Sequence, residues 1–129
     1  MILPPLENDL IELMIAATDK SLSDVEISVS DRIYCSVVLA SGGYPKSYEK
    51  GYKISGLDKC DDDALIFHSG TKSENGKLFT NGGRVLNVVG SGQTLAEAID
   101  HSYKNTELIS FKDSYFRRDI GKKGLKKID

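Results

Sequence analysis

Short glycine turns, rather than helices, separate the apolar segments in the middle of this chain. The clearest case is Gly82-Gly83, which lies between the runs Lys77 to Thr80 and Arg84 to Val89 and predicts a hairpin there. Parallel strands need a crossover of about a dozen residues or more, whereas antiparallel strands can be joined by short turns. The chain is therefore expected to build a mainly antiparallel sheet.

Other strands are predicted upstream of this hairpin. Asp24 to Ser30 alternates apolar and polar residues with the period of a half-buried strand. Ile33 to Ala40 is rich in β-branched residues and apolar on both faces, which indicates a central position in the sheet. Lys53 to Ser55 predicts a short strand, Ala64 to His68 a buried one, and Ser69 to Lys72 a loop.

Helical patterns occur near both ends. Asn8 to about Lys20 spaces its apolar residues as an amphipathic helix does. Thr94 predicts the start of a second helix that ends near Leu108, because Glu97 three residues later completes a capping box. Strands in the middle with a helix near each end predict an α+β fold built on a small, mainly antiparallel sheet.

Composition excludes several classes of function. The 129 residues are 40% hydrophobic and 28% charged with a formal net charge of -2, so the chain has no general attraction for nucleic acid. No apolar run approaches the roughly 20 residues that span a membrane. Cys35 and Cys60 lack metal-ligand spacing and no secretory signal precedes them, which indicates a reduced, cytoplasmic setting. The basic residues near the end are interpreted as a solvated terminus: Arg117, Arg118, Lys122, Lys123, Lys126 and Lys127.

The residues around Gly82-Gly83 also have the chemistry of an anion site. Glycine lets backbone N–H groups approach a ligand closely, and the adjacent Arg84 offers a forked donor suited to phosphate. Lys72, in a loop after a neighbouring strand, could converge on the same anion, and two cations with backbone donors suit a monophosphate. The alternative is an ordinary hairpin turn with Arg84 and Lys72 in solvent.

No set of residues predicts catalysis or a metal site in this chain. His68 ends a strand and could serve as an acid, a base or a phosphate donor, or be hydrogen-bonded for structural reasons. His101 lies among polar residues of a helix and is predicted to be on the surface, and histidines and carboxylates lack metal-ligand spacing. Ser41 and Ser91 lie outside any Gly-x-Ser-x-Gly elbow, and Asp61 to Asp63 lacks the spacing of a calcium loop.

Six motifs in order along the chain together resemble one enzyme family. The motifs are Val38 to Pro45, Tyr48 to Gly51, Ile54 to Leu57, Phe67 to Lys72, Thr80 to Leu86 and Tyr115 to Ile120. Over nearly the whole chain they resemble the C-terminal part of glycinamide ribonucleotide synthetases, the phosphoribosylamine-glycine ligases of purine biosynthesis.

This resemblance implies a carbon-nitrogen ligase of the ATP-grasp superfamily. The family activates glycine as an acyl phosphate with ATP and a magnesium ion, and the amine of 5-phosphoribosylamine then displaces the phosphate. The N-terminal and ATP-grasp domains have no counterpart in this sequence, so the chain alone is expected to be inactive, as a fragment or a shortened gene model. Residues 1–22 are expected to be a remnant helix from the end of the ATP-grasp domain. Residues 23–129 are expected to be the C-terminal substrate-side domain, of the rudimentary single hybrid motif type.

The resemblance also suggests roles for individual residues. In related purine enzymes, a lysine in a Gly-Lys loop and an arginine on the following strand hold the substrate phosphate. The site residues implied by position are Lys72, Gly82, Gly83 and Arg84 for phosphate, and Tyr44, Pro45 and His68 for a domain interface or the substrate side. An alternative is a truncated, non-catalytic module with a binding or assembly role. Either way, an exposed apolar patch is expected where other domains would cover the surface.

Overall fold

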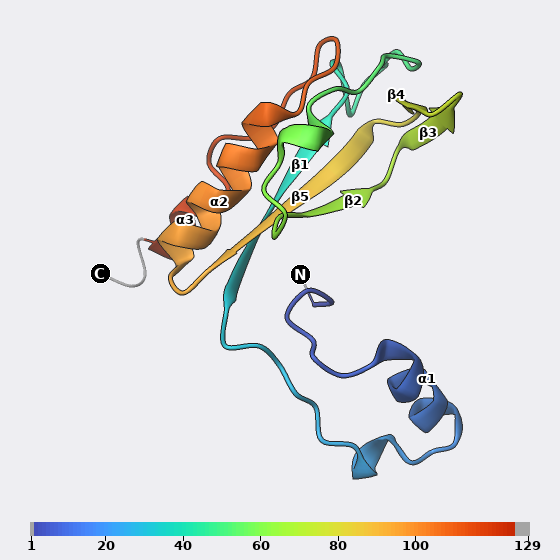
Figure 1. The fold of residues 1–129 in the computed structure, drawn as a ribbon, viewed down its shortest axis with the longest axis vertical. Helices are drawn as coiled ribbons and strands as arrows, with labels where there is room; N and C mark the ends of the chain where they lie inside the picture. Colours follow the sequence, from blue (N-terminus) through green and yellow to red (C-terminus); the bar gives the residue numbers. More distant parts are fainter. Residues whose placement is uncertain (1, 126–129) are drawn as a thin grey trace.

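A computed structural model describes residues 2–125 and contains two antiparallel sheets and one long helix (Figure 1). The elements in order are α1 (Leu10–Thr18), the 3-10 turn η1 (Leu22–Asp24), β1 (Ile33–Ala40), the 3-10 turn η2 (Leu57–Lys59), β2 (Leu65–His68), β3 (Thr71–Glu74), β4 (Lys77–Thr80), β5 (Arg84–Gly92), α2 (Leu95–Leu108) and α3 (Lys122–Leu125). The predicted α+β class with antiparallel sheets is confirmed.

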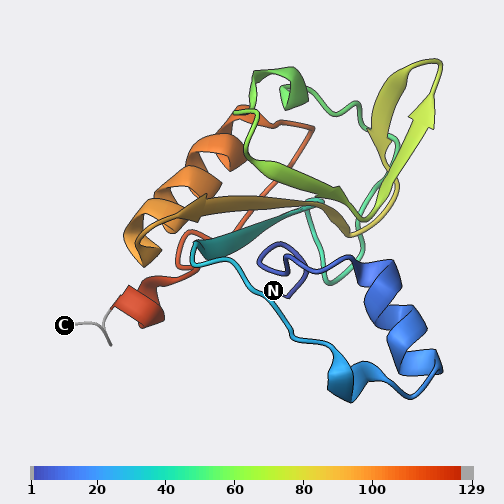
Figure 2. The ribbon, with the colours of Figure 1, turned by 60° about the horizontal axis from the view of Figure 1, so that its bottom comes forward.

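The larger sheet has the strand order β1-β5-β2, and helix α2 covers one of its faces (Figure 2). Both outer strands run antiparallel to β5. The core lies between sheet and helix, where Leu39, Leu86 and Val88 are completely buried and Phe111 closes one end. Burial of apolar area at roughly 25 cal/mol per Å² is the main term that holds these two layers together.

Helix α2 begins where the sequence predicts. The Thr94 hydroxyl accepts the N–H of Glu97 at 3.2 Å, and the Glu97 carboxylate accepts the N–H of Thr94 at 3.3 Å, so the capping box is present. The helix approaches the sheet closely because Gly90 has no side chain: a Cβ there would lie 2.4 Å from the backbone nitrogen of Ser102. Local sequence therefore sets where the helix starts, and one glycine sets its distance from the sheet.

The strand predicted to be central lies instead at an edge of the sheet. The one strand that pairs with β1 among the described residues is β5, apart from a single bridge between Ala40 and Tyr115, and Val38 is 38% exposed. Strand β2, predicted to be buried, is the other edge, with Leu65 and Phe67 each more than 40% exposed. The apolar outer residues of both strands misled the prediction, because they form an open face of the sheet rather than a second core.

The predicted hairpin around Gly82-Gly83 is wrong. Strand β4 pairs with β3, which the sequence placed partly in a loop, and the two form a separate hairpin. Its turn is Asn75-Gly76, where φ is 49° and 71°, as a type I′ turn requires. Gly82-Gly83 instead connects the small sheet to the large one. The short strand predicted at Lys53 to Ser55 forms only isolated bridges.

The N-terminal segment contains the predicted helix but not the predicted strand. Asp9 caps α1 through the N–H of Ile11 at 2.7 Å. Within Asp24 to Ser30 only Val29 makes a bridge, to Leu6, and Ile27 is 52% exposed, because no sheet edge lies beside this segment. Among the described residues, no helix is long and apolar enough to cross a membrane.

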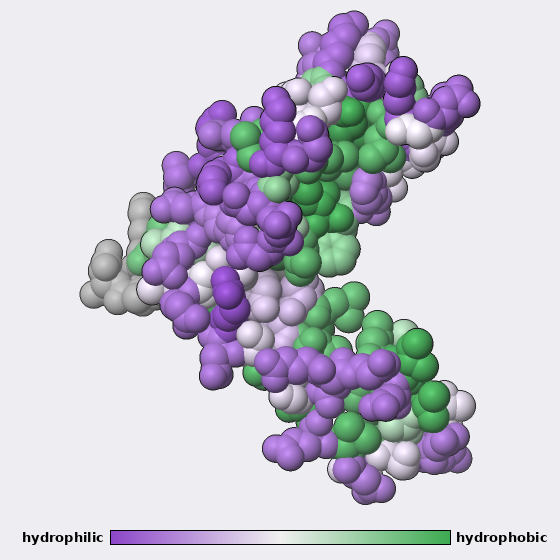
Figure 3. Space-filling view, viewed as in Figure 1, coloured by the Kyte–Doolittle hydropathy of each residue, from purple (hydrophilic) through white to green (hydrophobic). Residues whose placement is uncertain are grey.

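Exposed apolar side chains gather on both sides of the hollow between the N-terminal segment and the sheets (Figure 3). On helix α1 they include Ile11, Met14 and Ile15, and on the open face of the sheet they include Val38 and Phe67. The expected exposed apolar surface is thus present. Two of the basic residues near the end, Lys126 and Lys127, lie outside the described residues.

Candidate anion-binding site

An open pocket of about 630 Å³ lies where the two sheets meet. The connection Gly82-Gly83 and the first residue of β5, Arg84, form one part of its lining. Its other lining residues with polar groups in their side chains are Tyr44, Tyr48, Ser69, Asn81 and Asn87. The lining residues include one cation and no carboxylate, a charge pattern that favours an anionic ligand.

Ser41 holds the Gly82-Gly83 connection in place through two hydrogen bonds. Its hydroxyl donates to the Gly82 carbonyl at 2.8 Å, and its backbone N–H donates to the Gly83 carbonyl at 2.8 Å. Within residues 2–125, the N–H groups of Gly82 and Gly83 donate to no acceptor. A Cβ on Gly83 would lie 2.1 Å from Cδ2 of Tyr44, so only glycine fits under this ring. The connection therefore holds its carbonyls in place and leaves two amide donors unused.

Arg84 carries the free positive charge of the pocket. Its side chain is exposed and forms no hydrogen bond or ion pair with any described residue. By contrast, Arg117 pairs with Asp119 at 2.7 Å and Arg118 with Glu107 at 2.8 Å. An unpaired guanidinium beside unused backbone donors is suited to a phosphate or carboxylate.

Lys72 lies outside this lining. It belongs to strand β3 rather than to the predicted loop, and its Nζ is 2.8 Å from Oε1 of Glu74. His68 also lies outside the lining, with Nδ1 3.0 Å from the Thr71 hydroxyl, although the next residue, Ser69, belongs to the pocket.

Tyr44 lines the pocket and Pro45 is exposed beside it. The Tyr44 carbonyl accepts the hydroxyl of Tyr115 at 2.5 Å, which ties this loop to the segment after α2. Sequence reasoning missed Asn87, whose Oδ1 accepts the Ser36 hydroxyl at 2.5 Å. A polar residue inside an otherwise apolar strand was the only available signal, and it did not reveal which face Asn87 occupies.

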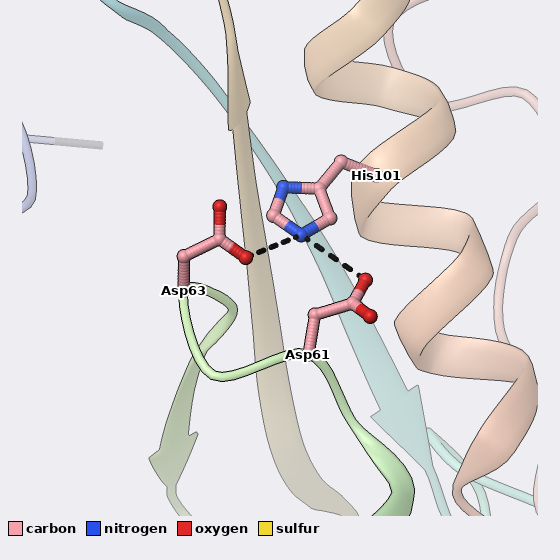
Figure 4. A group of neighbouring side chains, drawn as sticks. All are labelled: Asp61, Asp63 and His101. Carbon is pink, nitrogen blue, oxygen red and sulfur yellow. Dashed lines mark ion pairs between the residues drawn. The ribbon is translucent and has the colours of Figure 1, made fainter.

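A second group of polar side chains lies on the helix-covered side of the molecule. His101 on α2 faces Asp61 and Asp63 in the turn before β2 (Figure 4). The prediction of a surface His101 is wrong, because the side chain is only 15% exposed. The fold also brings this histidine close to two carboxylates that have no metal-ligand spacing along the sequence. Hydrogen bonds from Lys104 and then Asn105 hold the pKa of Asp61 below its ordinary value.

The cysteines offer no activated nucleophile. Cys35 is buried in β1, and burial raises the pKa of the Cys60 thiol, with Asp61 and Asp58 adding to the effect. The fold and the pocket together define a class: a small α+β domain with an open pocket whose charged lining residue is an arginine.

Comparison with known proteins identifies the family. Residues 34–123 match the family model described as phosphoribosylglycinamide synthetase, C domain. The chain belongs to this family, and the resemblance inferred from its motifs is confirmed.

Several relatives are ligases of much greater length. The chain is 49% identical over 123 residues to a phosphoribosylamine–glycine ligase of Fusobacterium nucleatum, covering 93% of this chain and 29% of that protein. It is 44% identical to a bifunctional purine biosynthetic protein of Pichia angusta, covering 97% of this chain and 16% of that protein. The crystal structure of the phosphoribosylamine–glycine ligase of Thermotoga maritima matches with a TM-score of 0.66 and 34% identity, covering 84% of this chain and 27% of that one.

Proposed function

We propose that this chain is the substrate-side domain of a phosphoribosylamine–glycine ligase and that its pocket binds the phosphate of 5-phosphoribosylamine. The observation that carries the proposal is the unpaired Arg84 beside the two unused amides of Gly82 and Gly83. A phosphate oxygen accepts several such donors at once, and each charge-assisted hydrogen bond contributes about 1.5 to 3 kcal/mol. Glycine, ATP and magnesium would bind to domains outside this chain, since the pocket supplies no carboxylate for a metal.

Lys72 is proposed as a second, weaker contributor. Its side chain is 41% exposed and, among the described residues, pairs only with Glu74, which is 56% exposed, so a bound phosphate could replace this ion pair at small cost. This part of the proposal depends on movement of a long side chain, whereas the part played by Arg84 does not. Substitution of Arg84 is therefore expected to weaken phosphate binding more than substitution of Lys72.

Titration with ribose 5-phosphate tests the proposal on the chain itself. In amide NMR spectra, the signals of Gly82, Gly83 and Arg84 should shift with added ligand. Arg84→Ala should abolish these shifts, whereas the matched control Arg118→Ala should keep them, because Arg118 pairs with Glu107 away from the pocket. Shifts confined to other regions of the spectrum would contradict the assignment.

Kinetics in a full-length ligase that contains this chain test the functional role. Arg84→Ala should raise the KM for phosphoribosylamine by roughly 10- to 100-fold, the equivalent of one charge-assisted contact. Lys72→Ala should raise it less, and neither change should alter the KM for ATP. An unchanged KM for phosphoribosylamine in Arg84→Ala would refute the proposal.

We also propose that residues 1–22 belong to the preceding ATP-grasp domain and that the protein is cytoplasmic. Helix α1 exposes Ile11, Met14 and Ile15, and the family match begins only at residue 34. Both cysteines are free thiols, which suits a reducing compartment. Removal of residues 1–22 should therefore leave the unfolding midpoint of the remaining domain nearly unchanged. A large drop in the midpoint would show that the helix is part of this domain.

A further inference from the structure

His101 lies between two carboxylates that the sequence places far from it. Its Nε2 is 3.5 Å from Oδ2 of Asp61 and 3.3 Å from Oδ1 of Asp63 (Figure 4). One ligand atom from each of the three residues lies within 4.8 Å of the others. The imidazole comes from α2 and the carboxylates from the turn between η2 and β2, so this group joins two elements of the fold.

The distances are unusual for a hydrogen-bonded histidine. Hydrogen bonds between nitrogen and oxygen are typically about 2.7 to 3.2 Å long. No described residue forms a hydrogen bond with His101 Nε2, although the side chain is only 15% exposed. Ligand atoms about 2.0 to 2.1 Å from a tetrahedral zinc ion are separated by about 3.3 to 3.4 Å. The two separations between His101 Nε2 and the carboxylate oxygens are thus close to those between ligand atoms of one zinc ion.

Neighbouring groups position the ligand atoms of His101 and Asp61, whereas Asp63 is open to solvent. Nδ1 of His101 lies 3.1 Å from the backbone nitrogen of Ser91 and 3.2 Å from the Ser91 carbonyl. In the tautomer that binds a cation, Nδ1–H donates to the carbonyl and Nε2 keeps its lone pair, whereas an Nδ1 that accepts the Ser91 N–H leaves the proton on Nε2. Lys104 and Asn105 hold the Asp61 carboxylate by hydrogen bonds of 2.9 to 3.1 Å. Asp63 has no hydrogen-bond partner among the described residues and is 66% exposed, which provides a route of entry from solvent.

We propose that His101, Asp61 and Asp63 form a binding site for a divalent ion of the zinc class, with water completing its coordination. Imidazole with carboxylates suits zinc and its transition-metal neighbours, whereas magnesium and calcium prefer oxygen ligands alone. The bound ion would link the turn before β2 to helix α2 and so stabilise the position of β2 at the edge of the sheet. The competing structure is a metal-free ion pair between protonated His101 and the two aspartates.

Calorimetric titration of the 129-residue chain with Zn²⁺ decides between them. One ion should bind per chain, and Mg²⁺ should bind far more weakly. Asp63→Asn should weaken Zn²⁺ binding by about tenfold or more, since a ligand is lost. Asp62→Asn is the matched control: it makes the same charge change in the same turn but lies outside the group, and should change affinity less than about twofold.

Further measurements distinguish loss of the ligand set from misfolding of a variant and from binding of the ion by a cysteine. His101→Asn, checked for folding by circular dichroism, should abolish binding, and Zn²⁺ should raise the Tm of the parent chain and of Asp62→Asn but not of Asp63→Asn. The Co²⁺ complex should show no thiolate charge-transfer band, since the Cys60 sulfur instead faces the Gly56 carbonyl at 3.6 Å. Absence of stoichiometric Zn²⁺ binding, equal affinity in Asp63→Asn and Asp62→Asn, or a thiolate band would overturn the proposal.

Discussion

The hydroxyl of Ser102 is expected to be worth more to stability than its small size suggests. This side chain on α2 is completely buried and reaches the sheet between β1 and β5. Its hydroxyl oxygen accepts the N–H of Gly90 at 2.9 Å. Its single O–H can donate to the carbonyl of Cys35 at 2.8 Å, and the carbonyl of Ala98 in the same helix is a second acceptor at 2.9 Å. Gly90 and Cys35 are register partners, so the hydroxyl bridges the two strands at this pair.

Ser102→Ala would leave both backbone groups buried without this partner. An unsatisfied buried donor or acceptor costs about 1 to 3 kcal/mol, and the better helix propensity of alanine offsets about 0.5 kcal/mol. Because two groups lose their partner, the free energy of unfolding should fall by about 1.5 to 5.5 kcal/mol, a large part of the 5 to 15 kcal/mol typical of a domain. Urea unfolding followed by circular dichroism measures this loss.

Ser73→Ala provides the matched control for this measurement. Ser73 lies on the exposed strand β3, and no hydrogen bond of its side chain is present among the described residues. Its replacement should change the free energy of unfolding by less than about 0.5 kcal/mol. If Ser102→Ala cost no more than this control, the two strands would have closed directly on each other, and the proposed bridging role would be wrong.

Three other predictions concern the core, a helix cap and the response to acid. Leu86→Ala, at a completely buried position, should cost about 2 to 5 kcal/mol in urea unfolding, and Leu65→Ala at a 41% exposed position clearly less. Thr94→Ala should cost about 1 kcal/mol in the same assay by removing the cap of α2. Hydrogen bonds from Arg117 hold the pKa of Asp119 below its ordinary 3.8. The advantage in urea midpoint of the parent over Asp119→Asn should therefore be present above pH 3.8 and disappear as the pH falls through the lowered pKa.

Local signals in the sequence predicted local structure well. The Thr94 capping box predicted the start of α2, since both of its hydrogen bonds form within four residues of chain. The sequence Asn75-Gly76 is an equally local signal for a hairpin turn. Strand β3 was nevertheless not predicted, because the residues around this turn are polar. The predicted hairpin at Gly82-Gly83 failed because the two strands that flank this connection each pair elsewhere.

Nonlocal pairing explains the remaining errors. The sequence of Ile33 to Ala40 cannot reveal whether a second strand lies on its outer side, and here none does. The approach of His101 to Asp61 and Asp63 likewise depends on where α2 packs over the sheet, which is set by Gly90 and Ser102 rather than by the spacing of the three residues. By contrast, the arginine and the glycines of the candidate phosphate site are adjacent in the chain, so the sequence alone suggested an anion site there.

Strand β5 connects the candidate phosphate site to the core. Arg84 begins this strand, while Val85, Leu86 and Val88 further along are completely buried between neighbouring elements. The backbone at Arg84 is therefore anchored by a largely buried strand, although its guanidinium pairs with none of the described residues. In the proposed phosphate site, the backbone of Arg84 and the Gly82-Gly83 peptides held by Ser41 would need little rearrangement when an anion binds, so the ordering cost would fall mainly on the arginine side chain. The fold would thus preorganise the backbone of the site, which an exposed loop could not do.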